Sequence, residues 1–218
     1  MRRCKHLRRL RRMFENRIDR LERRINEVAF VRDHKDRDIV VSYGTIEALN
    51  AWALFSRSFY LSCALGSITE RKKIVTMTSI TDPLGYAIVL FKPKATPISP
   101  ATLTSPPAWH RRDEPPWHDP TVLMRICGNL KCSIQNEIIN AFSLNLNVFR
   151  DLPIVRNFFA HRNSQTIQAV RNIAPRYTLP THLIPTEFLI SVSMNSTVPV
   201  ILDWLAEMKI TAEFLCKA

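Results

Sequence analysis

The sequence predicts a mainly α-helical protein, and three observations favour this fold class. Of the 218 residues 46% are hydrophobic, enough for one sizeable core, and only 4 Gly stand beside 14 Pro, which favours helices joined by a few stiff connections. Apolar residues recur at three- and four-residue steps through several long segments. At Asp119-Pro120 an N-cap residue is followed by proline at the first helical position, a typical helix start.

The first expected element is a basic amphipathic helix within residues 1–30. Residues 1–24 hold 11 Lys or Arg against three acids, so most of the formal net charge of +12 lies here. Too few acids lie nearby to pair with these arginines within the helix, and we therefore expect an external anion. A solvated helix face or a dimerising coiled coil is the alternative. The expected RNA contacts in this helix are Arg8, Arg9, Arg11 and Arg12.

The remaining residues, 31–218, are expected to form one helical domain. The helices predicted in it are near 40–65, 120–143, 151–173 and from 199 onward. Gly66 is the expected stop of the first of these. Residues 68–96 allow either a hairpin or a short helix, and residues 184–194 are expected to be extended.

A Pro-rich loop is expected over residues 93–120, because its prolines exclude a continuous helix. It contains two Trp-His pairs, Trp109-His110 and Trp117-His118. The tryptophans either stack on RNA bases or anchor the loop to the core. Because the prolines leave no recognisable ligand spacing around the histidines, we predict no metal site and no cofactor.

Cysteine usage and hydropathy predict a cytoplasmic protein. The five cysteines form no Cys-x-x-Cys pair, and their odd number without a secretory leader favours reduced thiols. No stretch reaches the roughly 20 apolar residues that a membrane span needs. A pI near 10.0 indicates a polyanionic partner, either nucleic acid or an acidic membrane surface. Docking on a membrane surface or scaffold through residues 1–28 is therefore a further alternative.

The chemical motif of the chain is the segment Arg156-Asn157-Phe158-Phe159-Ala160-His161. On a helix Asn157 and His161 are four residues apart and share one face, with Arg156 offset by one residue. Phe158 and Phe159 are expected to point toward the core and to fix the helix. We therefore expect a cation, an amide and an imidazole to line one cleft.

The residues before the motif contain a candidate helix start. Asp151 is expected to be the N-cap, and Pro153 suits the first turn. The motif also has a simpler interpretation, in which Arg156 and His161 lie at a helix edge and face water or a carboxylate.

The motif resembles the Arg-polar-x-x-x-His signature of the HEPN superfamily, many of whose members are metal-independent RNA-cleaving domains. The resemblance covers residues 40–66 and 119–216 and implies an up-and-down helical bundle. It also implies a metal-independent endoribonuclease of toxin or antiviral-defence type, in which the 2′-hydroxyl of RNA attacks the adjacent phosphate. Arg156, Asn157 and His161 would be the catalytic residues, and Arg162 would be a further RNA contact.

The same resemblance implies partners for the chain. HEPN ribonucleases pair two motifs across a homodimer, so we expect a homodimer with a composite site. A cognate antitoxin or a defence-system partner is expected as well. The alternative function is a non-catalytic HEPN-like module that binds RNA or a protein.

Overall fold

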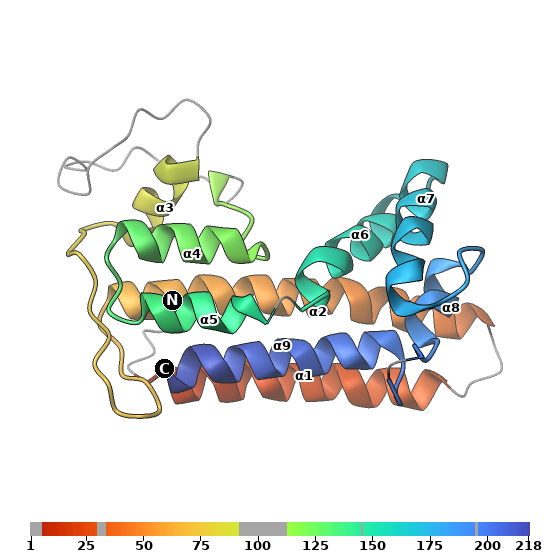
Figure 1. Cartoon of the computed structure of the whole chain (residues 1–218), viewed down its shortest axis with the longest axis horizontal. Helices are drawn as coiled ribbons and strands as arrows, with labels where there is room; N and C mark the ends of the chain where they lie inside the picture. Colours follow the sequence, from red (N-terminus) through yellow and green to blue (C-terminus); the bar gives the residue numbers. More distant parts are fainter. Residues whose placement is uncertain (1–5, 30–33, 92–112, 145, 195) are drawn as a thin grey trace. The chain divides into compact units, whose positions relative to one another are not determined.

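The computed structural model describes residues 6–29, 34–91, 113–144, 146–194 and 196–218, and this part of the chain is mainly α-helical (Figure 1). It contains isolated β-bridges but no strand within these ranges. The predicted fold class is therefore confirmed. The elements in chain order are α1 (Leu7–Ala29), α2 (His34–Ala64), α3 (Pro83–Phe91), α4 (Pro120–Asn129), α5 (Gln135–Ser143), α6 (Val148–His161), α7 (Ser164–Ile173), the 3-10 helix η3 (Ala174–Tyr177), α8 (Pro185–Ile190) and α9 (Val200–Lys217).

The chain divides into two compact units. Unit 1 consists of the described residues within Met1–Met13, Trp52–Leu144 and Ala212–Ala218, and unit 2 of those within Phe14–Ala51 and Asn145–Thr211. Helices α1, α2 and α9 contribute residues to both units. The expected domain boundary at residue 30 is not one of these divisions, and it stays a prediction.

In unit 1 the end of the Pro-rich loop is anchored by Trp117. Its side chain is only 6% exposed, and its ring stacks on Tyr60 with the centroids 5.5 Å apart. The indole N–H donates to Glu114 at 2.8 Å, and the same carboxylate forms an ion pair with Arg57 of α2. Of the two roles considered for these tryptophans, Trp117 has the anchoring one. Trp109 and the rest of 92–112 lie outside the described residues.

The prediction of one continuous helix over 120–143 is wrong in its middle. Helix α4 starts as expected, with the Asp119 carboxylate accepting a hydrogen bond from the Thr121 N–H at 2.8 Å. It ends at Asn129, and Lys131 then adopts a left-handed φ of 51°. The backbone of this break bonds to another segment, because the Thr78 N–H donates to the Leu130 carbonyl and the Ser133 N–H to the Thr76 carbonyl. Partners distant in sequence therefore replace the helical hydrogen bonds here.

Residues 68–91 settle the choice between hairpin and helix. The residues before α3 form no hairpin ladder. They are joined only by single bridges, such as the one between Ile68 and Ile74. Helix α3 then begins at Pro83, and the Asp82 carboxylate accepts a hydrogen bond from the Gly85 N–H at 3.0 Å. The short helix is thus present, as one of the two alternatives predicted.

Unit 2 is built from the later part of α1, the first part of α2, helices α6 to α8 and most of α9. Helices α1 and α2 approach closely at Gly44, where a Cβ atom would lie 3.0 Å from the Ile25 Cδ1 atom. Helix α7 folds back along α6 (Figure 1). The extended segment predicted over 184–194 is wrong for residues 185–190, because α8 forms there with Pro185 in its first turn and with the Glu187 carboxylate accepting from the Ile184 N–H. After α8, Ser191 is extended and Val192 forms a β-bridge with Pro199.

The four described cysteines are buried thiols that form no disulfide with one another, and Cys4 lies outside the described residues. Burial raises the pKa of the Cys63 thiol, which keeps that thiol protonated. In the described part of the chain no helix is both long and apolar enough to cross a bilayer.

Candidate functional site

The predicted motif lies in the second half of α6, where Asn157 and His161 share one exposed side of the helix. Asn157 and His161 are exposed, Arg156 is half-buried, and Phe159 is buried. Phe158 is half-buried and packs edge-on against the Phe159 ring, with the centroids 5.3 Å apart. The prediction of core-facing aromatic rings is confirmed for Phe159.

The first half of α6 is held by Asp151, whose carboxylate is 0% exposed. It accepts hydrogen bonds from the Tyr177 hydroxyl at 2.9 Å, from the Arg150 Nε at 3.0 Å and from the Arg176 Nη1. The Tyr177 oxygen in turn accepts from the Trp204 indole N–H at 2.9 Å. The carboxylate therefore connects α6 to η3 directly and to α9 through Tyr177.

This position contradicts the prediction that Asp151 is an N-cap. Helix α6 begins at Val148, so Asp151 and Pro153 both lie inside it. An N-cap carboxylate would accept from amides of its own first turn, whereas this one is turned into the core toward side chains from η3. Burial of an ionised group requires such partners, and that requirement decides its orientation.

The first turn of α6 is fixed by Glu207 of α9. The Val148 N–H, which has no partner within the helix, donates to the Glu207 Oε2 at 3.0 Å. Burial raises the pKa of Glu207, and the hydrogen bond from Val148 opposes this effect. The charges of Asp203 and Asp151 raise the pKa further. Glu207 thus satisfies an orphan donor, although burial makes its ionised form costly.

The last turn of α6 is fixed by Arg162, which follows it in a left-handed conformation with φ 40°. Its backbone N–H donates to the Phe158 carbonyl at 2.7 Å, and its guanidinium donates to the Asp38 carboxylate at 2.9 Å and to the Ser42 hydroxyl at 3.2 Å. The guanidinium also lies over the Phe159 ring, 5.9 Å from the centroid. These contacts offset the strain of a conformation in which glycine is usual. The Arg162 guanidinium, for which an RNA contact is expected, therefore already has partners within the protein.

The helix predicted over 151–173 is therefore two helices. Asn163 caps α7: its side chain accepts from the Thr166 N–H at 2.9 Å, and its own N–H donates to the Thr166 hydroxyl at 3.2 Å. This capping box begins a new helix directly after Arg162. The break places His161 at the exposed end of α6 rather than in the middle of a long helix.

Arg156, Asn157 and His161 take no part in these fixing contacts. Among the residues that the structure describes, none forms a hydrogen bond or an ion pair with these three side chains. Arg156 and His161 leave the helix in directions about 140° apart, since five residues at about 100° each separate them. Asn157 and His161 differ by only about 40°. One copy of α6 therefore presents an amide and an imidazole together, with the guanidinium on another side.

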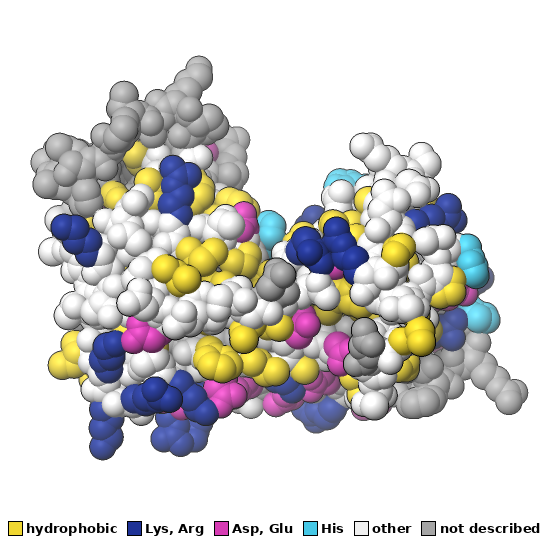
Figure 2. Space-filling view, viewed as in Figure 1, with side chains coloured by type: hydrophobic (Ala, Val, Ile, Leu, Met, Phe, Trp, Pro, Cys, Tyr) yellow, Lys and Arg dark blue, Asp and Glu magenta, His cyan; other side chains and the backbone are white. Residues whose placement is uncertain are grey.

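The arginines of the basic helix differ in their surroundings. Arg8, Arg9 and Arg12 are exposed in unit 1. Figure 2 shows dark blue side chains in the region where α1 begins, where the end of α9 and the loop after α2 also lie. Arg11 is engaged, because its Nε donates to the Glu70 carboxylate at 2.6 Å. In unit 2 a carboxylate distant in sequence likewise pairs with Arg17. The expectation that these arginines need an external anion therefore fails for Arg11 and Arg17.

Several groups that organise the site were not predicted from the sequence. Asp151, Tyr177, Trp204 and Glu207 lie on three different elements, and no local spacing links them. A signal did exist for the break in the motif helix, namely an Asn followed three residues later by a hydroxyl residue at Asn163. In the described part of the chain no group of three His, Cys, Asp or Glu side chains is arranged to hold a metal ion.

Comparisons of the chain with family models, with curated proteins and with solved structures gave no match. The HEPN resemblance thus stays a prediction that rests on residues 156–161 and on the helical fold.

Replacement of Asp151 by Asn should destabilise the protein by about 3 kcal/mol, because an amide NH₂ would face donors that now meet carboxylate oxygens. The free energy of unfolding, measured by denaturant titration at pH 7, provides the test. Glu27→Gln, an exposed acid on α1, is the matched control and should change this free energy by less than about 0.5 kcal/mol. Equal values for the two variants would contradict the organising role of Asp151.

Glu207→Gln should flatten the pH dependence of stability. Because the pKa of Glu207 in the folded protein is raised above the ordinary 4.5, its contribution is complete below pH 4.5 and is lost as the pH rises through the folded value. Gln stays neutral and can still accept from Val148, so the variant should equal the wild type near pH 4 and exceed it at pH 7. We expect a gain below about 1 kcal/mol, since part of the carboxylate reaches solvent. A variant less stable than the wild type at pH 7, with an unchanged pH slope, would contradict this.

Proposed function

We propose that the protein is a metal-independent endoribonuclease whose catalytic residues are Arg156, Asn157 and His161. The supporting observation is a division of roles along α6. The side chains on either side of the motif fix the helix, whereas the three motif side chains have no hydrogen-bond or ion-pair partner among the described residues. A half-buried guanidinium with an exposed amide and an exposed imidazole on a fixed helix match the requirements of phosphodiester chemistry.

The proposed reaction uses the 2′-hydroxyl of RNA as the nucleophile. Its oxygen forms a bond to the adjacent phosphorus while the bond from phosphorus to the 5′-oxygen breaks. The hydroxyl proton leaves to a base, and the departing 5′-oxygen receives a proton from an acid. The products are a 2′,3′-cyclic phosphate and a 5′-hydroxyl, and neither water nor an oxidant is consumed.

Each motif residue has a role in this scheme. Imidazole exchanges protons near neutral pH, so His161 transfers a proton to or from the reacting oxygens. The Arg156 guanidinium neutralises the charge that develops on the phosphorane-like transition state. Asn157, which shares the helix face of His161, orients the phosphate or the imidazole.

A second copy of the chain completes the proposed site. One feature supports this: Arg156 diverges from His161 by about 140° around α6, so the guanidinium and the imidazole of one copy do not face the same phosphate. In a homodimer, Arg156 of one copy can meet His161 of the other. The exposed arginines of α1 would draw in the RNA backbone, with Arg8, Arg9 and Arg12 as the available cations. An activity of this toxin or antiviral-defence type requires a restraining partner, such as a cognate antitoxin or defence protein.

The second candidate is a non-catalytic HEPN-like module that binds RNA or a protein. The divergence of Arg156 and His161 in a single copy favours it for a monomer, because neither group alone provides both proton transfer and charge neutralisation. Such a module would bind RNA without releasing cyclic phosphate, and binding would survive loss of His161.

Cleavage of RNA in EDTA should fall by at least about 100-fold in His161→Ala and in Arg156→Ala, since each removes a group that acts in the transition state. His182→Ala is the matched control, because His182 is also exposed in unit 2 and should leave the rate unchanged. The measurement is the initial rate of 2′,3′-cyclic phosphate formation, with unfolding curves to show that the variants are folded.

Mixing the two inactive variants tests the composite site separately. In a heterodimer one site has both defects and the other pairs an intact Arg156 with an intact His161. An equimolar mixture should therefore recover about a quarter of the wild-type rate if subunits exchange at random. Undiminished cleavage by His161→Ala would overturn the mechanism, and no recovery on mixing would overturn the shared site alone.

A further inference from the structure

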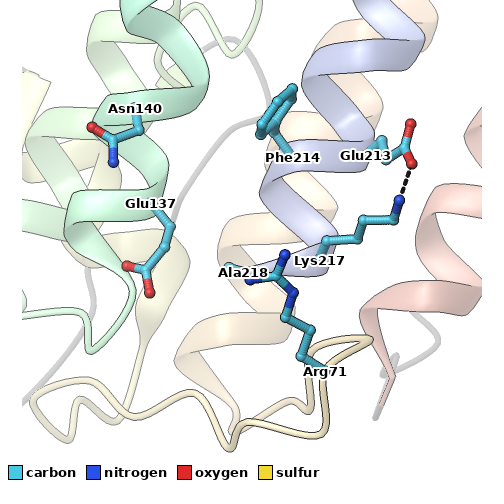
Figure 3. Close-up of a pocket in the computed structure, with 7 residues that line it drawn as sticks. All are labelled: Arg71, Glu137, Asn140, Glu213, Phe214, Lys217 and Ala218. Carbon is cyan, nitrogen blue, oxygen red and sulfur yellow. Dashed lines mark hydrogen bonds and ion pairs between the residues drawn. The ribbon is translucent and has the colours of Figure 1, made fainter.

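Unit 1 contains a pocket of about 450 Å³ that lies outside the motif helix, in residues to which the cleavage mechanism assigns no role. Glu137 and Asn140 of α5 line one side, Phe214 and Lys217 of α9 line another, and Arg71 rises from the loop after α2 (Figure 3). Its volume lies within the range of about 300–1,000 Å³ that small-molecule sites occupy.

The charges around this pocket leave one cation available. Lys217 pairs with Glu213 on the same helix, and this hydrogen bond lowers the pKa of Glu213. Glu137 pairs with Lys73 at 2.6 Å. Among the described residues, none forms a hydrogen bond or an ion pair with the exposed guanidinium of Arg71. The two acids that line the pocket are thus neutralised within the protein, and an anion is the complement of Arg71.

Phe214 adds an aromatic surface to the same pocket. Its side chain is 53% exposed although it belongs to a helix whose other apolar residues are largely buried. A phenyl ring open to solvent at a pocket wall offers a π-face to a flat ligand group. The side-chain amide of Asn140 lies across the pocket and can donate and accept hydrogen bonds.

The loop that carries Arg71 is fixed rather than loosely attached. The preceding Glu70 accepts two hydrogen bonds from Arg11, at 2.6 and 3.1 Å, and its N–H donates to the Cys216 carbonyl at 2.9 Å. Lys72 follows with a left-handed φ of 64°. On α1, Arg8 and Arg12 flank Arg11 and are exposed, so further positive charge lies beside this loop.

We infer that this pocket binds a nucleotide, with the phosphate on Arg71 and the base stacked on Phe214. An aromatic group joined to a doubly negative phosphate matches the available guanidinium, the open ring and the surrounding cations better than a neutral or singly charged ligand does. This inference goes beyond the proposed cleavage and does not depend on it. The nucleotide can be free or can be one unit of an RNA strand.

The test is calorimetric titration of the full chain at fixed low salt with adenosine 5′-monophosphate, ribose 5-phosphate and inorganic phosphate. Adenosine monophosphate should bind at least about tenfold more tightly than ribose 5-phosphate, because only it carries a base. Arg71→Gln should weaken binding of both by about tenfold. Phe214→Ala should weaken only the adenosine compound, and Phe214→Trp should restore it.

Matched controls remove similar side chains elsewhere. Arg24→Gln removes an exposed cation of α1, and Leu54→Ala removes an apolar side chain of unit 1 that is 51% exposed. Both should leave the dissociation constants unchanged. Since Arg71 and Phe214 are exposed, their variants should melt at the wild-type temperature.

Titration with a 5′-phosphorylated triadenylate distinguishes the source of the nucleotide. Binding of the trinucleotide that also weakens in Phe214→Ala would indicate a unit of a strand, whereas binding of the mononucleotide alone would indicate a free nucleotide. Both results support the site. It would be overturned if the wild type bound none of these compounds at millimolar concentration, or if the Arg71 and Phe214 variants bound them as the wild type does.

Discussion

Burial removes the Asp151 carboxylate from water, and Arg150, Arg176 and Tyr177 replace the hydration that it loses. An ionised carboxylate without such partners would cost several kcal/mol in a protein interior, so α6 can occupy its place only when η3 supplies them. The Trp204 indole extends the network into α9. Unit 2 is therefore organised around one negative charge that no single helix can satisfy.

This constraint accounts for the exposure of the motif. With the first half of α6 bonded through Asp151 and Glu207, and its end bonded through Arg162, the remaining polar groups of the helix are not required for packing. Asn157 and His161 can then remain exposed without loss of stability. A site that is fixed by its neighbours while its own side chains stay available is the arrangement that catalysis or anion binding needs.

The sequence predicted those features that depend on neighbouring residues. Asp119-Pro120 correctly marked the start of α4, Gly66 follows the end of α2, and the four-residue spacing correctly placed Asn157 and His161 on one face. It failed where a partner distant in the chain decides the structure. The contact of Arg162 with Asp38 of α2 and the contacts of Asp151 with η3 join residues distant in the chain, so local patterns carried no signal for them. The break after Arg162 did have a local signal in the Asn163 capping box. The resemblance to HEPN ribonucleases rests on the motif and on the helical fold and says nothing of these supports.

The division of roles along α6 is tested most directly by the free energy of unfolding of one triple variant, Arg156→Ala, Asn157→Ala and His161→Ala combined. If the fold does not use these side chains, denaturant titration should give a value within about 1 kcal/mol of the wild type, since alanine is also a good helix former. A loss of about 3 kcal/mol or more would show that the motif supports the fold, and it would contradict a division between fixing and available side chains.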